Sequence, residues 1–380
     1  MKLVKDKEDE TINFLDMFAG IGGFRLGMEA AGHHCLGFCE IDRFARASYQ
    51  AIHETKGELE WHDIRQITNE EWRELRGCVD VLCGGFPCQA FSLAGKRLGF
   101  EDTRGTLFFE LARCAKEVQP RFLFFENVRG LLSHDKGQTF KTILTTLDEL
   151  GYDVEWQVLN SKDFGLPQSR ERVFLIGHSR AYSRHFLFPL RGKASSAALE
   201  KEGMTGRGIQ VVGHLPGSFE QNTRVFSPKG LAPTLTTMSS TDKIPKIIQD
   251  EQGPTLKLRE ATKQGYASAC EGDSVTLDYP TSSTYRGRIG HQIAHTLTTS
   301  GNQGVAVPSQ DKEHQSQLTI RRLTPRECFR LQGFPDWTYD KAAAVNSKSQ
   351  LYKQAGNSVS VPVIIAIAQR LKRIEELEVR

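Results

Sequence analysis

One loop of the sequence carries a cysteine whose surroundings suit a nucleophile. The loop is Gly84-Gly-Phe-Pro-Cys-Gln-Ala-Phe-Ser92, and it follows the apolar run Val79–Cys83. Glycine and proline constrain the backbone there, so a thiol just past a strand is held out toward a substrate. A buried structural cysteine is the alternative, which a lone cysteine would favour. The flanking Gly-Gly and Phe-Ser favour the exposed loop, and they make Cys88 the candidate nucleophile.

Charged and polar side chains flank two later apolar runs. Glu126 closes the run Phe122–Phe125, where an acid would face the same crevice as Cys88. Strand alternation ahead of a further apolar run places three polar side chains on one face: Gln168, Arg170 and Arg172. Two arginines and a glutamine on one side of an edge are suited to holding an anion or a base.

A glycine-rich turn and two acids indicate a nucleoside pocket. The turn, Asp16-Met-Phe-Ala-Gly-Ile-Gly-Gly-Phe-Arg-Leu-Gly27, follows a strand-like run and opens a helix, and its glycines let the backbone approach a ligand closely. It lacks the downstream lysine of a phosphate-binding loop. Glu40 could accept both hydroxyls of a ribose, and Asp63 could accept an adenine amino group. Each acid alone could be a solvated charge; together they predict an adenosine site without a phosphate.

Composition argues against several other classes of protein. The eight cysteines form no Cys-x-x-Cys pair and the histidines show no zinc-ligand spacing, so we expect no metal. No apolar run reaches the roughly 18 residues of a membrane span, and the charged N-terminus has no signal-peptide core. We therefore expect a cytoplasmic protein with no membrane association. The net charge of +3 is by itself no nucleic-acid signature.

The elements that must position these residues alternate between strand-like and helix-like stretches. This alternation predicts an α/β fold, a mostly parallel sheet with helices on both faces, in which ligands bind beyond the carboxyl ends of the strands. The predicted strands are Thr11–Phe18, His34–Cys39, Val79–Cys83, Arg121–Phe125 and Arg172–Ile176. The predicted helices are Arg25–Ala31, Thr106–Val118, Gln138–Leu150, Arg321–Gln332 and an amphipathic helix that includes Val361 and Leu371.

Changes in composition and in helical periodicity along the sequence predict a domain at 1–180 and a smaller β- and loop-rich domain at 185–320. They also predict a C-terminal segment at 321–380 that packs back on the first domain. The second domain holds an internal echo, since Ala232-Pro-Thr-Leu-Thr-Thr237 resembles Ala294-His-Thr-Leu-Thr-Thr299. We interpret the surrounding stretches 224–240 and 288–304 as a duplicated hairpin-like unit. Coincidence in a threonine-rich stretch is the alternative.

Six blocks in order resemble the bacterial and phage DNA (cytosine-5) methyltransferases. They span about Thr11 to Gln369, and no catalytic position departs from the family pattern. The blocks are Phe18-Ala-Gly-Ile-Gly-Gly23, Gly85-Phe-Pro-Cys-Gln-Ala-Phe-Ser92, Glu126-Asn-Val128, Gln168-Ser-Arg-Glu-Arg172, Arg322-Leu-Thr-Pro-Arg-Glu-Cys328 with Leu331-Gln-Gly-Phe-Pro335, and Gln354-Ala-Gly-Asn-Ser-Val359. The resemblance implies a Rossmann-like class I methyltransferase fold and a type II restriction-modification or orphan enzyme.

The resemblance also implies a reaction. Cys88 attacks carbon 6 of a cytosine that is flipped out of double-stranded DNA, and carbon 5 then takes a methyl group from S-adenosylmethionine. Glu126 is expected to hold ring nitrogen 3 and the exocyclic amine, and Arg172 the ring oxygen. Arg170 and Ser92 are expected to orient the catalytic loop and contact phosphate. The stretch Ser92–Thr103 would be a closing lid, with a plain surface loop as the alternative.

Ligand-binding residues follow from the same resemblance. The expected cofactor residues are Phe18, Gly20, Gly22, Gly23, Glu40, Asp63, Pro87, Leu107, Asn357, Ser358 and Val359. The expected DNA-binding residues are Gln168, Thr296, Leu297, Lys96 and Arg97. The domain at 185–320 takes the place of a target-recognition domain. We expect a monomer, with a cognate restriction endonuclease as a separate partner on the same site.

Two alternatives come from other classes. A tRNA cytosine methyltransferase shares the catalytic apparatus but normally has a smaller insert than 185–320. A non-catalytic DNA-binding homologue is disfavoured by the presence of Cys88, Glu126 and Arg172. The sequence does not reveal which DNA site is methylated, because the side chains that read bases cannot be picked out without knowing which loops enter a groove.

Overall fold

The computed structural model describes residues 11–87, 107–182, 185–190, 255–278, 284–299, 303–309 and 318–378, together with the short strands at 211–214, 224–226 and 246–247. Several predicted residues lie outside this described part: Cys88, Ser92, Lys96 and Arg97, the predicted lid Ser92–Thr103, and the repeat at 232–237. Contacts divide the chain into two units. The first comprises Met1–Arg191, Ile293–Gln303 and Arg322–Arg380, and the second comprises Gly192–Gln292 and Gly304–Arg321.

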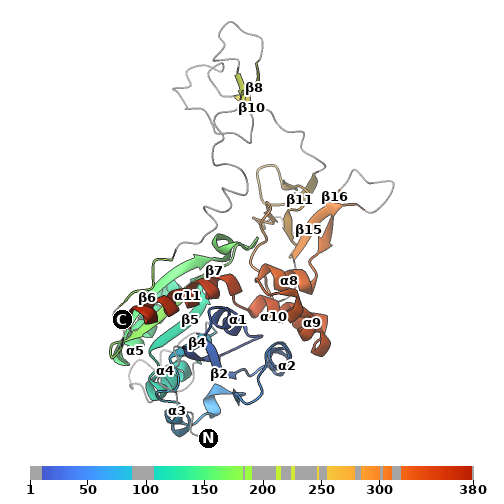
Figure 1. The fold of residues 1–380 in the computed structure, drawn as a ribbon. Helices are drawn as coiled ribbons and strands as arrows, with labels where there is room; N and C mark the ends of the chain where they lie inside the picture. Colours follow the sequence, from blue (N-terminus) through green and yellow to red (C-terminus); the bar gives the residue numbers. More distant parts are fainter. Residues whose placement is uncertain are drawn as a thin grey trace. The chain divides into compact units, whose positions relative to one another are not determined.

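A seven-stranded sheet forms the centre of the first unit (Figure 1). Its order is β3-β2-β1-β4-β5-β7-β6. The strands are β1 (Asn13–Met17), β2 (His34–Cys39), β3 (Leu59–Trp61), β4 (Val81–Gly85), β5 (Phe122–Val128), β6 (Tyr152–Asn160) and β7 (Glu171–Ser179). The pairings from β3 to β5 are parallel, whereas β7 runs antiparallel to both β5 and β6. The predicted mostly parallel α/β fold is therefore confirmed.

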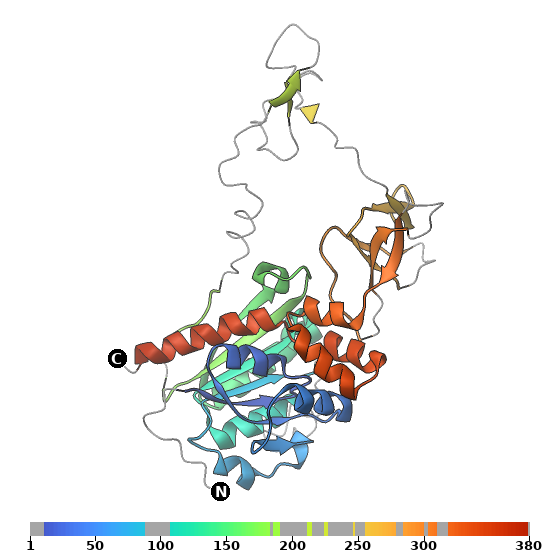
Figure 2. The same cartoon turned by 45° about the vertical axis from the view of Figure 1, so that its right-hand side comes forward.

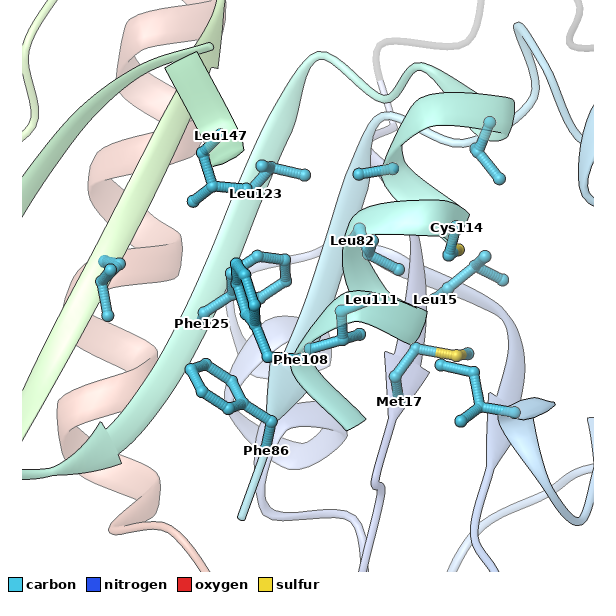
Figure 3. Close-up of a cluster of buried hydrophobic side chains, with 14 of the residues drawn as sticks. Leu15, Met17, Leu82, Phe86, Phe108, Leu111, Cys114, Leu123, Phe125 and Leu147 are labelled. Carbon is cyan, nitrogen blue, oxygen red and sulfur yellow. The ribbon is translucent and has the colours of Figure 1, made fainter. Parts of the chain in front are cut away.

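Helices cover both faces of this sheet because the apolar side chains of each central strand alternate between the faces. On one face Leu15, Leu82 and Leu123 pack against α3 (Asn69–Glu74), α4 (Leu107–Val118) and α5 (Gln138–Glu149). Figure 3 shows this cluster, with Phe108 and Leu111 of α4 beside Phe125 of β5. On the other face, Phe14 and Phe124 pack against α1 (Gly23–Ala30) and α11 (Val361–Glu378).

Four further α-helices of the described part of the first unit lie beside the carboxyl ends of β1 and β2. They are α2 (Arg43–Ile52), α8 (Pro325–Leu331), α9 (Asp336–Val345) and α10 (Lys348–Asn357), and Figure 2 shows α8 to α10 grouped together in red and orange. They share a small core that includes Ile21, Phe329 and Leu351. Side chains of α10 and the turn before it also reach α2: Gln354 Nε2 donates to Phe44 O at 3.0 Å, and so does Asn346 Nδ2 at 2.8 Å.

The predicted helix Arg321–Gln332 is wrong at its start. Strand β16 (Leu318–Arg322) occupies the first positions, and α8 begins only at Pro325. Thr324 caps the helix by accepting from Glu327 N, and the Glu327 carboxylate accepts from Thr324 N at 2.7 Å in return. This capping box, with proline at the first helical position, is the local reason that the helix starts there.

The described part of the second unit is built from short strands. One two-stranded sheet pairs β11 (Leu256–Arg259) with β12 (Tyr266–Ala269), and a four-stranded sheet has the order β14-β13-β15-β16. The remaining strands are β8 (Val211–His214), β9 (Arg224–Phe226), β10 (Lys246–Ile247), β13 (Ser274–Thr276), β14 (Ile289–Gly290) and β15 (Gln303–Pro308). Its described apolar core is small and centres on Ala269, Val275 and Ala306.

None of the described helices is long and apolar enough to cross a membrane. The described residues also contain no group of three or more histidine, cysteine or acidic side chains that could hold a metal ion.

Candidate active site

A cavity of about 420 Å³ opens at the carboxyl ends of the parallel strands. Its wall includes Phe18 after β1, Glu40 after β2, Gly85 of β4 and Glu126 of β5. The far side is closed by the C-terminal end of α10, including Asn357. Its size falls in the range of small-molecule sites, and its place at the strand ends is where ligands bind in open α/β sheets.

Glu126 and Arg172 meet at one end of this cavity. The antiparallel register opposes Arg172 to Val128, and Glu126 lies two residues before Val128 on β5. Arg172 Nε lies 3.0 Å from Glu126 Oε1 as an ion pair. Oε1 nonetheless accepts no hydrogen bond within the described chain, so a buried acceptor remains for a ligand. Burial raises the pKa of Glu126 above its usual range, although Arg172 and Arg170 oppose the shift.

Arg170 lies beside this pair but is held from the opposite direction. Its side chain is only 4% exposed, and Nη2 donates to the carbonyl oxygens of Ser358 at 2.7 Å and Gly356 at 3.1 Å. Burial, together with the charge of Arg172, lowers the pKa of Arg170 to about 9. We expected Arg170 to contact phosphate and the catalytic loop. The structure shows it as a cavity-lining link to the C-terminal block, and the expected contact with the catalytic loop stays a prediction because that loop is outside the described residues.

The backbone that leads into Cys88 is anchored at the cavity. Asn127 Nδ2 donates to Phe86 O at 2.8 Å, while its Oδ1 accepts from Val128 N at 2.8 Å. This buried amide ties the end of β4 to the end of β5. Pro87 follows, exposed and on the cavity wall, and the described chain stops there. Cys88 itself is outside the described residues, so its position next to the cavity rests on its place in the sequence.

The described cysteines offer no comparable nucleophile at this site. Six of the seven are buried, and burial raises the pKa of each of these thiols: Cys35, Cys39, Cys78, Cys83, Cys114 and Cys328. A thiol held in its protonated form is a poor nucleophile. The seventh, Cys270, belongs to the second unit.

The opposite end of the cavity is formed by the glycine-rich turn and Glu40. Phe18 and Gly20 both adopt left-handed backbone angles, with φ of 54° and 57°. The Glu40 carboxylate accepts from Gly20 N at 2.8 Å and from Asp42 N at 2.7 Å, so it fixes the turn as well as facing the cavity. Burial raises the pKa of Glu40. Each oxygen keeps a lone pair with which it can accept from a ligand hydroxyl.

The predicted cofactor residues divide into those that line the cavity and those that do not. Phe18, Gly20, Glu40, Pro87, Leu107 and Asn357 line it. Gly22, Gly23, Ser358 and Val359 lie behind the wall. A β-carbon at Gly23 would lie 2.7 Å from Val359 Cγ2 and 2.9 Å from Ser358 Oγ, so this glycine permits the turn to pack on the C-terminal block.

Asp63 is also absent from the cavity wall, contrary to the expected adenine contact. Its carboxylate begins a short 3-10 helix by accepting from Arg65 N, and it forms an ion pair with the Arg65 guanidinium at 2.7 Å. The side chain is therefore engaged by its own neighbour, and we propose that it lies outside the cofactor site, which the comparison of Glu40 and Asp63 variants below tests.

Several cavity residues escaped the sequence analysis, among them Ile41, Asp42 and Lys353. Ile41 is an apolar side chain that is 61% exposed on the wall, immediately after Glu40. Lys353 Nζ forms an ion pair with Asp42 Oδ2 at 2.6 Å, and both residues line the cavity. Exposure of an apolar residue next to the expected ribose acceptor could have signalled Ile41. No local signal links Lys353 to Asp42, because the two are 311 positions apart.

Two predicted DNA contacts are buried. Gln168 is 0% exposed and Leu297 is 4% exposed, so neither side chain can reach a DNA groove in this structure. Thr296 is half-buried and its hydroxyl donates to Ser169 O at 2.8 Å. The stretch from Ala294 to Leu297 packs on the residues that precede β7, and Gln168 is one of the residues that it contacts. We correct the role of Gln168 and Leu297 from base or groove contact to internal packing.

Comparison with known proteins identifies the family. The model of the C-5 cytosine-specific DNA methylase family matches residues 12–373. The chain belongs to this family. The methylase is 36% identical over 366 residues to the type II methyltransferase M.HpaII of Haemophilus parainfluenzae, a match that covers 95% of this chain and 89% of the relative. It is 34% identical over 372 residues to M.HhaI of Haemophilus parahaemolyticus, with 97% and 96% covered.

A phage relative and solved structures extend the comparison. The orphan methyltransferase M.SPRI of Bacillus phage SPR is 34% identical over 437 aligned positions, covering 95% of this chain and 97% of the relative. A mutant of Spodoptera frugiperda DNMT2 shares the fold with a TM-score of 0.51 at 18% identity, covering 96% of this chain and 100% of that one. The predicted family and enzyme class are confirmed: the methylase is a DNA (cytosine-5) methyltransferase.

Proposed function

We propose that the methylase transfers a methyl group from S-adenosylmethionine to carbon 5 of a cytosine flipped out of double-stranded DNA, through a covalent bond between Cys88 and carbon 6. The observation that carries the proposal is that one cavity joins the Glu40 end to the Glu126 and Arg172 end. A methyl donor bound at one end and a cytosine ring bound at the other would meet inside the same cavity. Family membership supports the same reaction.

The residues on the cavity wall fit this cofactor. Glu40 can accept ribose hydroxyls, and the exposed Ile41 offers an apolar surface for a flat base. The left-handed Gly20 has open space where a β-carbon would stand, so a ligand can approach the backbone. When bound, the cofactor supplies an electrophilic methyl group on a sulfonium. The other candidate cofactor residues on the wall are Phe18, Pro87, Leu107 and Asn357.

The chain's own residues account for the activation of the ring. The Cys88 thiolate would attack carbon 6, which breaks the 5,6 double bond and places an electron pair on carbon 5. Glu126, kept neutral more readily by burial, can donate its proton toward ring nitrogen 3. Arg172 would hold the ring oxygen and stabilise the developing charge. After methyl transfer, a base removes the carbon-5 proton, the double bond re-forms and Cys88 leaves.

DNA containing 5-fluorocytosine tests the covalent step, because fluorine at carbon 5 cannot be removed as a proton. We expect a denaturation-resistant adduct in the presence of S-adenosylmethionine, and Cys88→Ser should abolish it. Cys270→Ser is the matched control and should keep full adduct yield, because Cys270 lies in the second unit. Adduct formation by Cys88→Ser would show that another residue is the nucleophile. The same assay with tRNA separates DNA from the alternative substrate.

The recognition of DNA is proposed on the same basis. We propose that 185–320 is the target-recognition domain, that the first domain spans 1–180, and that 321–380 completes it. Ser92, Lys96 and Arg97 would contact DNA from the catalytic loop. The stretches 224–240 and 288–304 would then be two recognition elements, and replacing 224–240 should remove a subset of methylated sites. Unchanged methylation of every native site would refute the second element.

Three further expectations remain proposals. We propose that the methylase acts as a monomer, that it works in the cytoplasm, and that a cognate restriction endonuclease acts separately on the same site. Light scattering with and without a DNA duplex tests the first. A cell that carries the partner endonuclease but loses the methylase should accumulate breaks at the methylated sites, which tests the last.

A further inference from the structure

Gln168 occupies an unusual position between two parts of the first unit. It is fully buried, yet both ends of its amide are bonded to residues far away in the sequence. Oε1 accepts from Leu297 N at 2.9 Å, and Nε2 donates to Leu331 O at 2.9 Å. A buried amide that loses either partner leaves an unpaired polar group behind, so these two bonds hold the segments at a defined distance.

The segment that Gln168 holds is docked by several further contacts. Ala294 N donates to Pro167 O at 2.8 Å and Ser169 N donates to Ala294 O at 2.9 Å, which form a short parallel bridge. Thr296 Oγ1 donates to Ser169 O, and the Leu297 side chain packs into the core beneath α8 and α10. The stretch Ile293–Gln303 therefore belongs to the first unit, although the chain on either side of it is in the second.

The same short stretch runs directly into the active site. Two residues after Gln168, Arg170 holds the carbonyl oxygens of Gly356 and Ser358. Two residues later, Arg172 forms the ion pair with Glu126. Between them the backbone enters β7, which is bonded to β5 on one side and to β6 on the other. Three alternate residues of this stretch thus contact the docked segment, the cavity wall and Glu126.

The docked segment also touches the cavity wall itself. A β-carbon at Gly356 would lie 2.5 Å from Thr298 O, so the backbone of the segment passes directly against α10 next to Asn357. This close approach leaves little free space for the segment to shift on this side. Gln168 limits the shift on the other side.

We propose that Gln168 is a positioning residue that couples the Thr296-Leu297 segment to Arg170 and Arg172, so that methyl transfer depends on how the recognition domain sits on DNA. The inference rests on the proposed role of 185–320 in target recognition. It assigns the coupling to side-chain bonds of Gln168 and requires no contact between Gln168 and DNA. Loss of these bonds should make catalysis less sensitive to the DNA sequence, because a poorly matched site would no longer misplace the arginines.

The decisive variant is Gln168→Met, which keeps the length and volume of the side chain and removes both bonds. Gln332→Met is the matched control: Gln332 is also 0% exposed, with Nε2 bonded to Ala355 O and Oε1 bonded to the Ser360 hydroxyl, both at 3.0 Å. It has no hydrogen bond to Ile293–Gln303 in the described structure. Both variants lose two buried bonds, so a merely structural role predicts equal effects.

The readout is the set of methylated cytosines in genomic DNA, measured by bisulfite sequencing after expression of each variant. We expect Gln168→Met to lower the ratio of methylation at native sites to that at single-mismatch sites by about tenfold, and Gln332→Met to keep it. The KM for S-adenosylmethionine should be unchanged in Gln168→Met. An unchanged site ratio in Gln168→Met, or equal losses in both variants, would overturn the proposal.

A pH series provides a second test through Gln168→Glu. A neutral carboxyl group matches the amide, since it can accept from Leu297 N and donate to Leu331 O, whereas a carboxylate cannot donate. The site ratio of this variant, relative to wild type at each pH, should recover as the pH falls. A pH-independent ratio would contradict the assignment of the two bonds. Absence of the 5-fluorocytosine adduct in the wild type would instead refute only the covalent step, since both tests here follow methyl transfer.

Discussion

Arg172 Nε lies 3.0 Å from Glu126 Oε1, and the carboxylate oxygen accepts no hydrogen bond from the described chain. The contact exists because β7 runs antiparallel to β5, which brings the beginning of β7 to the edge where β5 ends. The pair combines a cation with an acid whose pKa is raised by burial. In the proposed reaction, this pair would serve a ring that accepts a proton on one atom while charge builds on its oxygen.

Replacement of Arg172 should slow the chemical step with little effect on the fold. We expect Arg172→Ala to lower the single-turnover rate of methyl transfer by a factor of about 10² to 10³, as for the loss of one donor that stabilises developing charge. The pKa of Glu126 should rise further without the neighbouring cation. Rapid-quench kinetics with saturating DNA measures the rate. A loss confined to the KM for DNA would assign Arg172 to binding instead.

Glu40 and Asp63 should behave oppositely toward the cofactor. Glu40→Gln cannot accept from both Gly20 N and Asp42 N and still offer two acceptors to a ribose, so the affinity for S-adenosylmethionine should fall about tenfold or more. Asp63→Asn should leave the affinity within about twofold, because that side chain is bonded to Arg65 outside the cavity. Isothermal titration calorimetry measures both. Equal losses would restore Asp63 to the site.

Asp16 should make the stability of the protein depend on pH. It is fully buried beneath the turn, and burial raises its pKa from 3.8 to about 8. A raised folded-state pKa means that the favourable contribution is complete below pH 3.8 and is lost as the pH rises toward 8. Asp16→Asn removes this dependence. Its melting temperature relative to wild type should therefore increase between pH 5 and pH 8.5, and a constant difference would count against a neutral Asp16.

Gly22 and Gly20 should tolerate alanine to different degrees, although both have positive φ. At Gly22 a β-carbon would lie 2.0 Å from His53 Nε2, a ring that is itself buried against Ile21 O, whereas at Gly20 no atom lies within 4 Å. Gly20→Ala should cost about 1 kcal/mol of unfolding free energy, the strain of the left-handed conformation. Gly22→Ala should cost roughly 3 kcal/mol or more. Urea unfolding distinguishes them.

The central sheet and the strand-end positions of the site could be predicted from the sequence because both depend on local patterns. Uninterrupted apolar runs predicted the positions of β1, β2, β4, β5 and β7, because strands covered on both faces need apolar residues at every position. The residues directly after those runs then fell at one edge. Glu40 and Glu126 were found in this way, and both line the cavity.

The contacts that the sequence could not reveal join positions that are far apart or unexpectedly close. Gln168 was expected to contact DNA, and only its bonds to distant residues such as Leu297, 129 positions later, explain why it is buried. Asp63 is engaged by Arg65 only two positions away, where its carboxylate also begins a short 3-10 helix. The sequence analysis did not predict β6 or α10, and the burial pattern of β6 shows no regular alternation.

The packing of α11 against α1 has a consequence for the order of events during synthesis. Phe24 and Met28 of α1 are covered by Ile364 and Ile367 of α11, which follows all seven strands of the sheet in the chain. This apolar face of the emerging sheet therefore stays uncovered until α11 has been synthesised, and Asn357 joins the cavity only shortly before. A nascent chain without α10 and α11 has an incomplete cavity and an exposed apolar surface. A prematurely terminated product should therefore be a target for chaperones and proteases rather than a partly active enzyme.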